Sequence, residues 1–238
     1  MRVIIIGGTS GIGRNLALKY SSRGDIVGVS GRREELLKSL KEEAPNKIFT
    51  KSFDVTSDNA DASFLSLVEM MGGVDLCIYC AGYGVNTREI IPEKELTAVE
   101  INVKGFVRIV TTAFNYFKEK GSGHIATISS IAATKGLGIA ACYSSSKRFQ
   151  ATYLEALEQV SNTNGFHIRF TTIQPGFIRT DFIHHDYPMV MDLEYAAKKI
   201  FKAINGCRRF VVIDLKWKII VFLWRLIPKW LWVKLKIR

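Results

Sequence analysis

Short apolar runs alternate with amphipathic helical patterns along most of the chain. Six runs of apolar, largely β-branched residues are typical of buried strands and cover residues 2–8, 25–32, 47–55, 74–82, 123–130 and 167–176. Between them, apolar residues recur at helical spacing, as at Leu16, Ala17 and Tyr20. The expected helices cover residues 13–24, 34–44, 60–72, 96–120 and 143–160. This alternation predicts an α/β fold, a Rossmann-like, doubly wound parallel sheet in a single domain with helices on both faces.

The C-terminal segment departs from this pattern. Nine Lys or Arg residues and one acidic residue lie between Arg208 and Arg238, so this segment carries eight of the eleven net positive charges. It also holds all four tryptophans of the chain. We therefore divide the sequence into a body, residues 1–207, and a basic, tryptophan-rich tail, residues 208–238.

The tail is predicted to lie on a membrane surface. Its longest charge-free run, Ile219–Trp224, is far shorter than the about 20 apolar residues that span a bilayer. Pro228 is expected to divide the tail into two short helices. Lys218 and Arg225 fall near one helix face, opposite aromatic and aliphatic residues, which favours the headgroup region of an anionic membrane. The alternative is that these helices pack on the body or across an oligomer interface.

Composition narrows the class of protein. A chain of 238 residues that is 47% hydrophobic and 23% charged indicates a globular domain and excludes a disordered protein. Cys77 and Cys80 lie in one strand-like run, where residues three apart point to opposite faces, so neither a redox pair nor a metal site is expected. Free thiols are typical of the reducing cytoplasm. The first apolar run leads directly into glycines of the fold, so no signal peptide is expected.

A glycine-rich loop, "IGGTSGIG", joins the first strand to the first helix. In α/β sheets this position binds a ligand phosphate at the helix N-terminus. Gly7, Gly11 and Gly13 give the spacing G-x-x-x-G-x-G, which differs from the standard dinucleotide fingerprint. A tight turn without a ligand is the alternative interpretation.

Tyr143 and Lys147, in "YSSSK", lie one helical turn apart and therefore share one helix face. Further candidate residues follow the predicted strands: Asp54 and Val55 after the third, Asn102 in the helix after the fourth, Ser130 at the end of the fifth, and Pro175, Gly176 and Thr180 after the sixth. Taken together, these motifs are similar to those of the short-chain dehydrogenase/reductase family, and the resemblance extends over residues 1–207.

The resemblance implies a catalytic set of Asn102, Ser130, Tyr143 and Lys147. Reduction of a carbonyl creates an alkoxide that needs a proton, and a phenol with a pKa of about 10 supplies it poorly unless its anion is favoured. A neighbouring ammonium favours the phenolate, so Tyr143 is expected to act as general acid in reduction and base in oxidation. By the resemblance, Lys147 also binds the nicotinamide ribose, Ser130 orients the substrate, and Asn102 anchors a water in a proton relay to Lys147.

Two stretches depart from the family pattern. Ile6 stands where the family usually has threonine before the glycine loop. The family's N-N-A-G after the fourth strand is here "YCAG", Tyr79 to Gly82. The lost asparagines leave open an alternative function, that of a catalytically silent dinucleotide-binding regulatory protein.

The end of the second strand indicates the cofactor NADP(H). NAD-preferring enzymes place an acid there for the ribose 2′-hydroxyl, whereas this chain has Arg32 and Arg33, with Arg14 after the glycine loop. A guanidinium suits a 2′-phosphate, and Arg32 is the expected main contact. By resemblance and charge, the residues expected to bind the cofactor are Gly7, Thr9, Ser10, Gly11, Ile12, Gly13, Arg14, Arg32, Asp54, Val55, Ala81, Gly82, Asn102, Tyr143, Lys147, Pro175, Gly176, Ile178 and Thr180.

The remaining expectations concern substrate and partners. An apolar lid is predicted at Phe182, Ile183 and 189–191, which favours a hydrophobic carbonyl or alcohol as substrate. The adjacent His184 and His185 are interpreted as loop residues, and no metal is expected. The resemblance implies a homodimer, or a tetramer, through two long helices around residues 99–117 and 144–160. We expect a cytoplasmic protein, peripheral at the inner face of a membrane. No nucleic acid is expected, because the tail's basic residues interleave with tryptophan and aliphatic residues.

Overall fold

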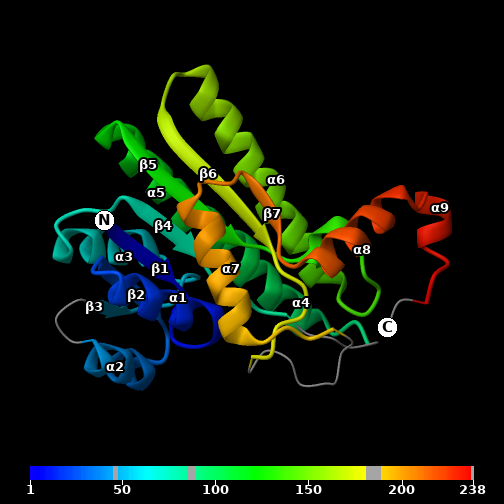
Figure 1. Cartoon of the computed structure of the whole chain (residues 1–238), viewed down its shortest axis with the longest axis horizontal. Coiled ribbons are helices and arrows are strands. Elements are labelled where there is room, and N and C mark those ends of the chain that lie inside the picture. Colours follow the sequence, from blue (N-terminus) through cyan, green and yellow to red (C-terminus); the bar gives the residue numbers. More distant parts are fainter. Residues whose placement is uncertain (45–47, 85–88, 181–188, 237–238) are drawn as a thin grey trace.

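The computed structural model describes residues 1–44, 48–84, 89–180 and 189–236. Within these ranges, seven strands form one parallel sheet in the order β3-β2-β1-β4-β5-β6-β7 (Figure 1). The strands are β1 (Arg2–Ile6), β2 (Ile26–Gly31), β3 (Ile48–Ser52), β4 (Leu76–Tyr79), β5 (Ser122–Ile128), β6 (His167–Gln174) and β7 (Phe210–Val212). The strand order reverses between β1 and β4, and in such sheets the ligand crevice lies at this switch point.

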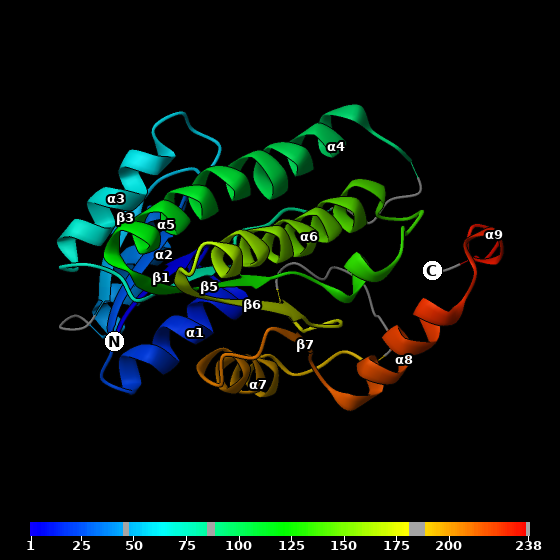
Figure 2. The ribbon, with the colours of Figure 1, turned by 90° about the horizontal axis from the view of Figure 1, so that it is seen from above.

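Helices cover both faces of the sheet. They are α1 (Gly11–Ser22), α2 (Glu34–Glu43), α3 (Ala60–Met70), α4 (Pro92–Val99), α5 (Phe106–Lys120), α6 (Ala141–Thr163), α7 (Leu193–Asn205), α8 (Leu215–Leu226) and α9 (Lys229–Trp232). One apolar core lies between the sheet and α1, α2, α7 and α8, and the other lies beneath α3, α5 and α6 (Figure 2). The predicted α/β, doubly wound fold class is confirmed.

The strands are apolar throughout because both of their faces are buried. Along β1, Val3 and Ile5 join the core under α1, while Ile4 and Ile6 join the core under α5. All four side chains are buried. A central parallel strand therefore shows a continuous apolar run in its sequence, without the alternation of a half-exposed strand.

The long helix expected at residues 96–120 has a different local structure. It begins four residues earlier, as α4, and passes through a π-helical segment, η1 (Glu100–Gly105), before α5. A π-helical turn inserts an extra residue into the helical repeat and changes the direction in which its side chains point. Asn102 lies in this segment and is completely buried.

The sheet continues past the boundary that we placed at residue 207. β7 lies in the expected tail and pairs with β6 from Thr172↔Phe210 to Gln174↔Val212. In α8, Trp217 and Val221 join the core around α1 and α7. As predicted, the tail helix is divided at Pro228, which separates α8 from α9. Throughout the described ranges, no helix has the length and hydrophobicity required to cross a bilayer.

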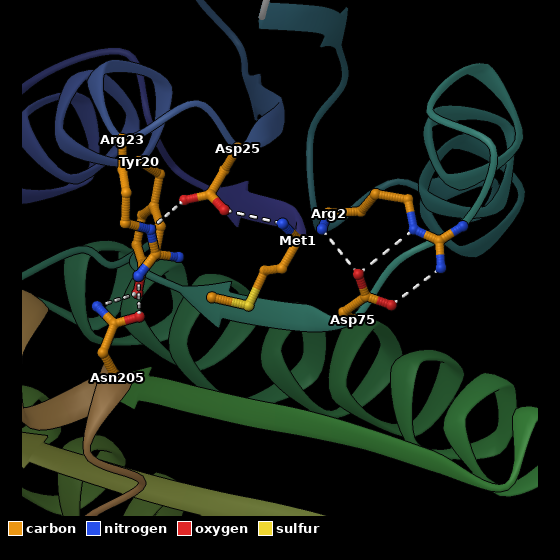
Figure 3. A network of polar contacts seen from close by, with 7 residues as sticks. All are labelled: Met1, Arg2, Tyr20, Arg23, Asp25, Asp75 and Asn205. Carbon is orange, nitrogen blue, oxygen red and sulfur yellow. Dashed lines mark hydrogen bonds and ion pairs between the residues drawn. The ribbon is translucent and has the colours of Figure 1, made fainter.

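Polar contacts hold the N-terminal end of the central strand β1 in place (Figure 3). This end of the strand lies opposite the carboxyl end, where the ligand crevice is expected. The Asp75 carboxylate accepts hydrogen bonds from the backbone N–H of Arg2 at 2.8 Å and from its guanidinium at 3.0 Å. Asp25 pairs with the Met1 amine at 2.9 Å and with Arg23 at 2.6 Å. Although burial alone would raise the pKa of Asp75, Arg2 and Lys120 hold it well below its usual value. These contacts fix the N-terminal end of β1, whose other end leads into the glycine loop.

Candidate active site

The glycine loop between β1 and α1 makes contacts that only glycine allows. A Cβ on Gly7 would lie 2.5 Å from the backbone nitrogen of Ala81, and Gly7 has a φ of +85°. A Cβ on Gly13 would lie 2.3 Å from the carbonyl oxygen of Gly7. The loop backbone therefore packs directly against the end of β4 and against the first turn of α1. This close packing leaves room for a ligand above the N-terminus of α1.

A cavity of 490 Å³ runs along the carboxyl edge of the sheet, from this loop to α6. It is lined by 17 of the 19 residues that the sequence assigned to a cofactor. The two exceptions are Arg14 and Asn102. Arg14 pairs with Glu43 at 2.8 Å, so its guanidinium is directed toward α2. Asn102 lies behind the cavity wall and is considered below.

Two arginines follow β2 at one end of the cavity. Arg32 pairs with Asp54 across 3.6 Å, and its side chain is 65% exposed. Arg33, which sequence reasoning did not select, donates hydrogen bonds to the hydroxyls of Thr9 at 2.8 Å and Ser10 at 2.6 Å. Ser30 also lines this end, and within the described ranges its buried hydroxyl has no hydrogen-bond partner.

Asp54, at the end of β3, is held as an anion. Its carboxylate accepts hydrogen bonds from the backbone N–H and the hydroxyl of Thr56, at 2.9 and 2.8 Å. Burial alone would raise the pKa of Asp54, but these bonds and the Arg32 charge keep it below its usual value. A negative oxygen therefore lies beside the two arginines at this end of the cavity.

At the other end of the cavity, Ser130, Tyr143 and Lys147 come together as predicted. Ser130 caps the short 3-10 helix η2 (Ile131–Thr134), and its Oγ accepts the N–H of Ala132 at 3.1 Å. The Ser130 hydroxyl is also hydrogen-bonded to the phenol of Tyr143. Lys147 Nζ lies 5.8 Å from the centre of the Tyr143 ring. All three residues line the cavity.

Burial controls the protonation of this group. It raises the pKa of Tyr143, and the hydrogen bond with Ser130 offsets part of that rise. Burial also lowers the pKa of Lys147 to about 8. We expected the ammonium to favour the phenolate, but in the protein alone the net direction for Tyr143 is upward. The reason is that desolvation of the phenolate outweighs the hydrogen bond with Ser130, which acts in the opposite direction.

Lys147 and Asn102 are joined through a residue that sequence reasoning missed. Lys147 Nζ donates to the carbonyl of Ile128 at 2.9 Å and to Gln150 Oε1 at 3.0 Å. Gln150 Nε2 donates in turn to the carbonyl of Asn102 at 2.9 Å. Gln150 is completely buried. Its carboxamide thus directly bridges the two groups that the family resemblance connects through water. Gln150 lies three positions after Lys147 on α6, and this i, i+3 spacing could have drawn attention to it.

The Asn102 side chain positions the loop after β4. Its Oδ1 accepts the backbone N–H of Tyr83 at 2.8 Å, and its Nδ2 donates to the Tyr83 carbonyl at 2.6 Å and to Ser146 Oγ at 3.0 Å. A Cβ on Gly82 would lie 3.5 Å from Asn102 Oδ1 and 3.4 Å from Lys147 Nζ. Asn102 therefore fixes the "YCAG" segment against α6. In that segment the Tyr79 hydroxyl donates to the carbonyl of Ile101 at 3.0 Å.

Among the described residues, those that form the apolar lining of the cavity differ from the ones predicted to form an apolar lid. Met189 and 190–191 do not line the cavity, and Met191 instead joins the core beneath α7. Phe182, Ile183, His184 and His185 lie outside the described residues. The apolar lining comes from Leu137, Ile139, Phe177 and Trp224. Trp224 belongs to α8, so the expected tail forms part of the cavity wall.

Comparison with known proteins agrees with this geometry. The short chain dehydrogenase family profile matches residues 1–189. An uncharacterized oxidoreductase of Myxococcus xanthus is 30% identical over 210 residues, covering 84% of this chain and 82% of that protein.

Two solved structures share the fold. A short-chain dehydrogenase from Streptomyces avermitilis superposes with a TM-score of 0.82 at 22% identity, covering 93% of this chain and 90% of that one. A short chain dehydrogenase from Burkholderia cenocepacia, solved in complex with NADP, gives a TM-score of 0.81 at 20% identity, covering 95% and 98% of the two chains. On the family profile, the motifs along this cavity and the shared fold, the chain belongs to the short-chain dehydrogenase/reductase family of oxidoreductases.

Proposed function

We propose that this protein is an NADP(H)-dependent oxidoreductase that interconverts a hydrophobic carbonyl compound and its alcohol, with Tyr143 as general acid and base. One observation carries the proposal. A single cavity has arginines and a glycine loop at one end, and the Ser130–Tyr143–Lys147 group with an apolar wall at the other. A dinucleotide laid along the cavity would bring its reactive ring to the end at which a substrate oxygen can meet Tyr143.

The residues along the cavity fit a phosphorylated dinucleotide. Gly7 and Gly13 line the cavity at the position where α/β folds hold a pyrophosphate, and their lack of a Cβ lets the loop backbone pack directly on Ala81 and on itself there. Arg32 and Arg33 provide two guanidinium groups for a 2′-phosphate, and the Ser30 hydroxyl provides a buried polar group beside them. The NADP bound to the Burkholderia cenocepacia relative supports the choice of this cofactor.

The chemistry divides between the cofactor and the protein. When bound, the nicotinamide supplies or accepts the hydride. In the reductive direction, Tyr143 donates its proton to the substrate oxygen, and Ser130 holds that oxygen by a hydrogen bond. The raised pKa of Tyr143 keeps the phenol protonated, and transfer of that proton then depends on the Lys147 charge favouring the phenolate that remains. In the oxidative direction, the Lys147 charge stabilises the phenolate that accepts a proton.

Gln150 positions Lys147 for this task. A buried ammonium loses the free energy of hydration unless its donors are satisfied, and Gln150 Oε1 supplies one of its two acceptors in the described structure. The same carboxamide binds the Asn102 carbonyl, so it couples α6 to η1. Gln150 thereby affects both the orientation of Lys147 and the pKa of its ammonium.

Replacement of Tyr143 by Phe should abolish turnover. We expect a loss of about 10²- to 10⁴-fold in kcat, the typical contribution of a positioned general acid, with NADPH binding retained. NADPH oxidation, screened across aldehydes, ketones, steroids and acyl carbonyls, measures the effect. Tyr153→Phe on the same helix is the matched control, because its hydroxyl bonds Thr111 away from the cavity. Full turnover in Tyr143→Phe would refute the mechanism. A wild-type protein that binds NADPH but oxidises none would instead favour the silent regulatory alternative.

Removal of the Arg32 guanidinium should weaken NADPH selectively. The Arg32→Ala variant loses a charged hydrogen-bond donor worth about 1.5–3 kcal/mol, so its Kd for NADPH should rise about 10- to 100-fold, with little change for NADH. Titration of both cofactors by fluorescence measures the two constants. Arg14→Ala serves as the control, since Arg14 lies outside the cavity lining. Unchanged NADPH affinity in Arg32→Ala would remove Arg32 from this role, and a loss in Arg33→Ala would transfer the role to Arg33.

Two substitutions of Gln150 should move the Lys147 pKa in opposite directions. Gln150→Leu removes an acceptor from the ammonium, so the pKa should fall from about 8 to about 7. Gln150→Glu places a carboxylate at the same position and should raise it. NMR titration of ¹³C-labelled lysines, with Lys147→Arg to assign the signal, measures the pKa without reference to turnover. Equal pKa values in the two variants would show that Gln150 has only a packing role.

We also propose a homodimer, with a tetramer as the larger alternative. The expected helix at residues 99–117 begins at the end of α4 and continues through η1 and α5, and α4 and η1 lie beside α6 (Figure 2). Val99, Phe149 and Val160 are exposed on these helices. We expect light scattering at micromolar concentration to give at least twice the chain mass of 26.7 kDa. Phe149→Lys should shift the mass toward one chain, because a buried unpaired charge disfavours an apolar interface. A wild-type monomer under these conditions would contradict the proposal.

A further inference from the structure

The helix α8 has two apolar faces, and only one of them is covered by the protein. Trp217, Val221 and Trp224, spaced four and three residues apart, point toward the body. Trp217 packs so closely on the turn after β6 that a Cβ on Gly176 would lie 2.2 Å from its Nε1. This face therefore packs on the body, as the alternative interpretation of the tail sequence proposed.

The opposite face is exposed and equally apolar. Leu215, Ile219, Phe222 and Leu226, also at helical spacing, are 70, 53, 61 and 63% exposed. In α9 and the residues after it, Trp230 and Val233 are also exposed, by 66 and 70%. Several large apolar side chains exposed together on one helix face mark an interaction surface rather than an ordinary protein exterior.

Basic residues border this exposed face on both sides. On the α8 helical wheel, Lys218 and Arg225 lie on one flank and Lys216 on the other, between the buried and the exposed apolar faces. The sequence analysis expected a basic face opposite a single apolar face, and that arrangement is wrong. Within the described residues, none of these three cations forms an ion pair with a carboxylate.

The tail is held in place, so its exposed face has a fixed orientation. Trp232 donates its indole N–H to the Gly136 carbonyl at 2.7 Å, and Lys135 donates to the Ile227 carbonyl at 2.8 Å. Trp224 and Trp232 pack edge to face with ring centres 5.3 Å apart. Figure 1 shows α8 and α9 together at one end of the molecule, beyond β6 and β7. The apolar face is thus presented outward by the folded protein and need not be released by unfolding.

We propose that this face, formed by α8 and α9, docks on the surface of a membrane that contains anionic phospholipid. The exposed leucine, phenylalanine and tryptophan side chains enter the headgroup and upper acyl region, and the flanking lysines and arginine contact lipid phosphates. Charge favours a lipid surface over a second copy of this chain, because two such basic faces repel each other. Since Trp224 also lines the cavity, docking places the apolar end of the cavity beside the bilayer, a consequence that rests on the proposed function.

Vesicle sedimentation tests the docking without any enzymatic readout. The full-length protein should co-sediment with equimolar phosphatidylcholine and phosphatidylglycerol, and much less with phosphatidylcholine alone. Phe222→Ser combined with Leu226→Ser should lower the partition coefficient at least tenfold. Leu65→Ser with Met70→Ser, two exposed apolar residues of α3, is the matched control and should bind like the wild type.

Charge removal should act separately from the loss of apolar area. Lys218→Gln with Lys229→Gln should weaken binding about fivefold for each cation at low salt, whereas Lys198→Gln with Lys202→Gln on α7 should have little effect. The thermal midpoint of each variant verifies that it folds. A wild-type protein that stays in the supernatant at low salt overturns the proposal. A second outcome also overturns the proposal: the wild type binds no vesicles and is a dimer, whereas the Phe222→Ser, Leu226→Ser variant is a monomer. The face would then be an interface between two copies of the chain.

Tryptophan fluorescence locates the contact, since all four tryptophans lie in the tail. Trp230 is exposed in the free protein, so docking should shift emission to shorter wavelength, and lipids with brominated acyl chains should quench it. Trp230→Phe should lose most of this response and still sediment. Vesicle binding without lipid quenching would show attraction of the basic residues alone and would overturn insertion of the apolar face.

Discussion

The buried ammonium of Lys147 constrains the arrangement of three elements around the active site. A charge removed from water costs several kcal/mol unless hydrogen bonds replace its hydration. Lys147 obtains them from the carbonyl at the end of β5 and from Gln150 one helical turn further along α6. Gln150 in turn binds the Asn102 carbonyl in η1. The end of β5, the start of α6 and the π-helical turn of η1 must therefore keep one mutual arrangement for this charge to be tolerated.

The π-helical turn makes that arrangement possible. In η1 the carbonyl of Asn102 is available to Gln150, and the Asn102 side chain is directed toward the loop after β4. That loop holds Gly82, where a Cβ would lie 3.4 Å from Lys147 Nζ. The polar end of the site is consequently built as one hydrogen-bonded unit, whereas the glycine loop at the other end depends only on the absence of side chains. A substitution at Gln150 would therefore remove hydrogen bonds from the polar end, whereas a side chain added at Gly7 or Gly13 would clash with the neighbouring backbone.

The tail connects the active site to the outside of the molecule. One face of α8 completes the hydrophobic core and contributes Trp224 to the cavity, and its other face remains apolar and exposed. A surface helix normally has a single apolar stripe, which faces the core. Here β7 and the turn at Gly176 contact one face of α8, and the opposite apolar face stays exposed at the end of the cavity.

The sequence by itself determined the fold class, the crevice and the identity of the polar group within it. Strands buried on both faces are apolar without interruption, and Leu16, Ala17 and Tyr20 are buried as their spacing predicts. The Y-x-x-x-K spacing also brings Tyr143 and Lys147 to one helix face. Periodicity, however, describes a segment relative to its own axis only. It shows which residues share a face and leaves open what that face meets.

Only the tertiary structure decided the remaining features, because each of them depends on a partner distant in the chain. Arg32 and Arg33 are adjacent in sequence, yet only Arg33 meets the hydroxyls of the glycine loop. Gln150 became part of the site because the Asn102 carbonyl faces it across 48 residues. The apolar residues of α8 fall into a buried and an exposed set because the body contacts one side of the helix, and hydrophobic spacing is the same on both.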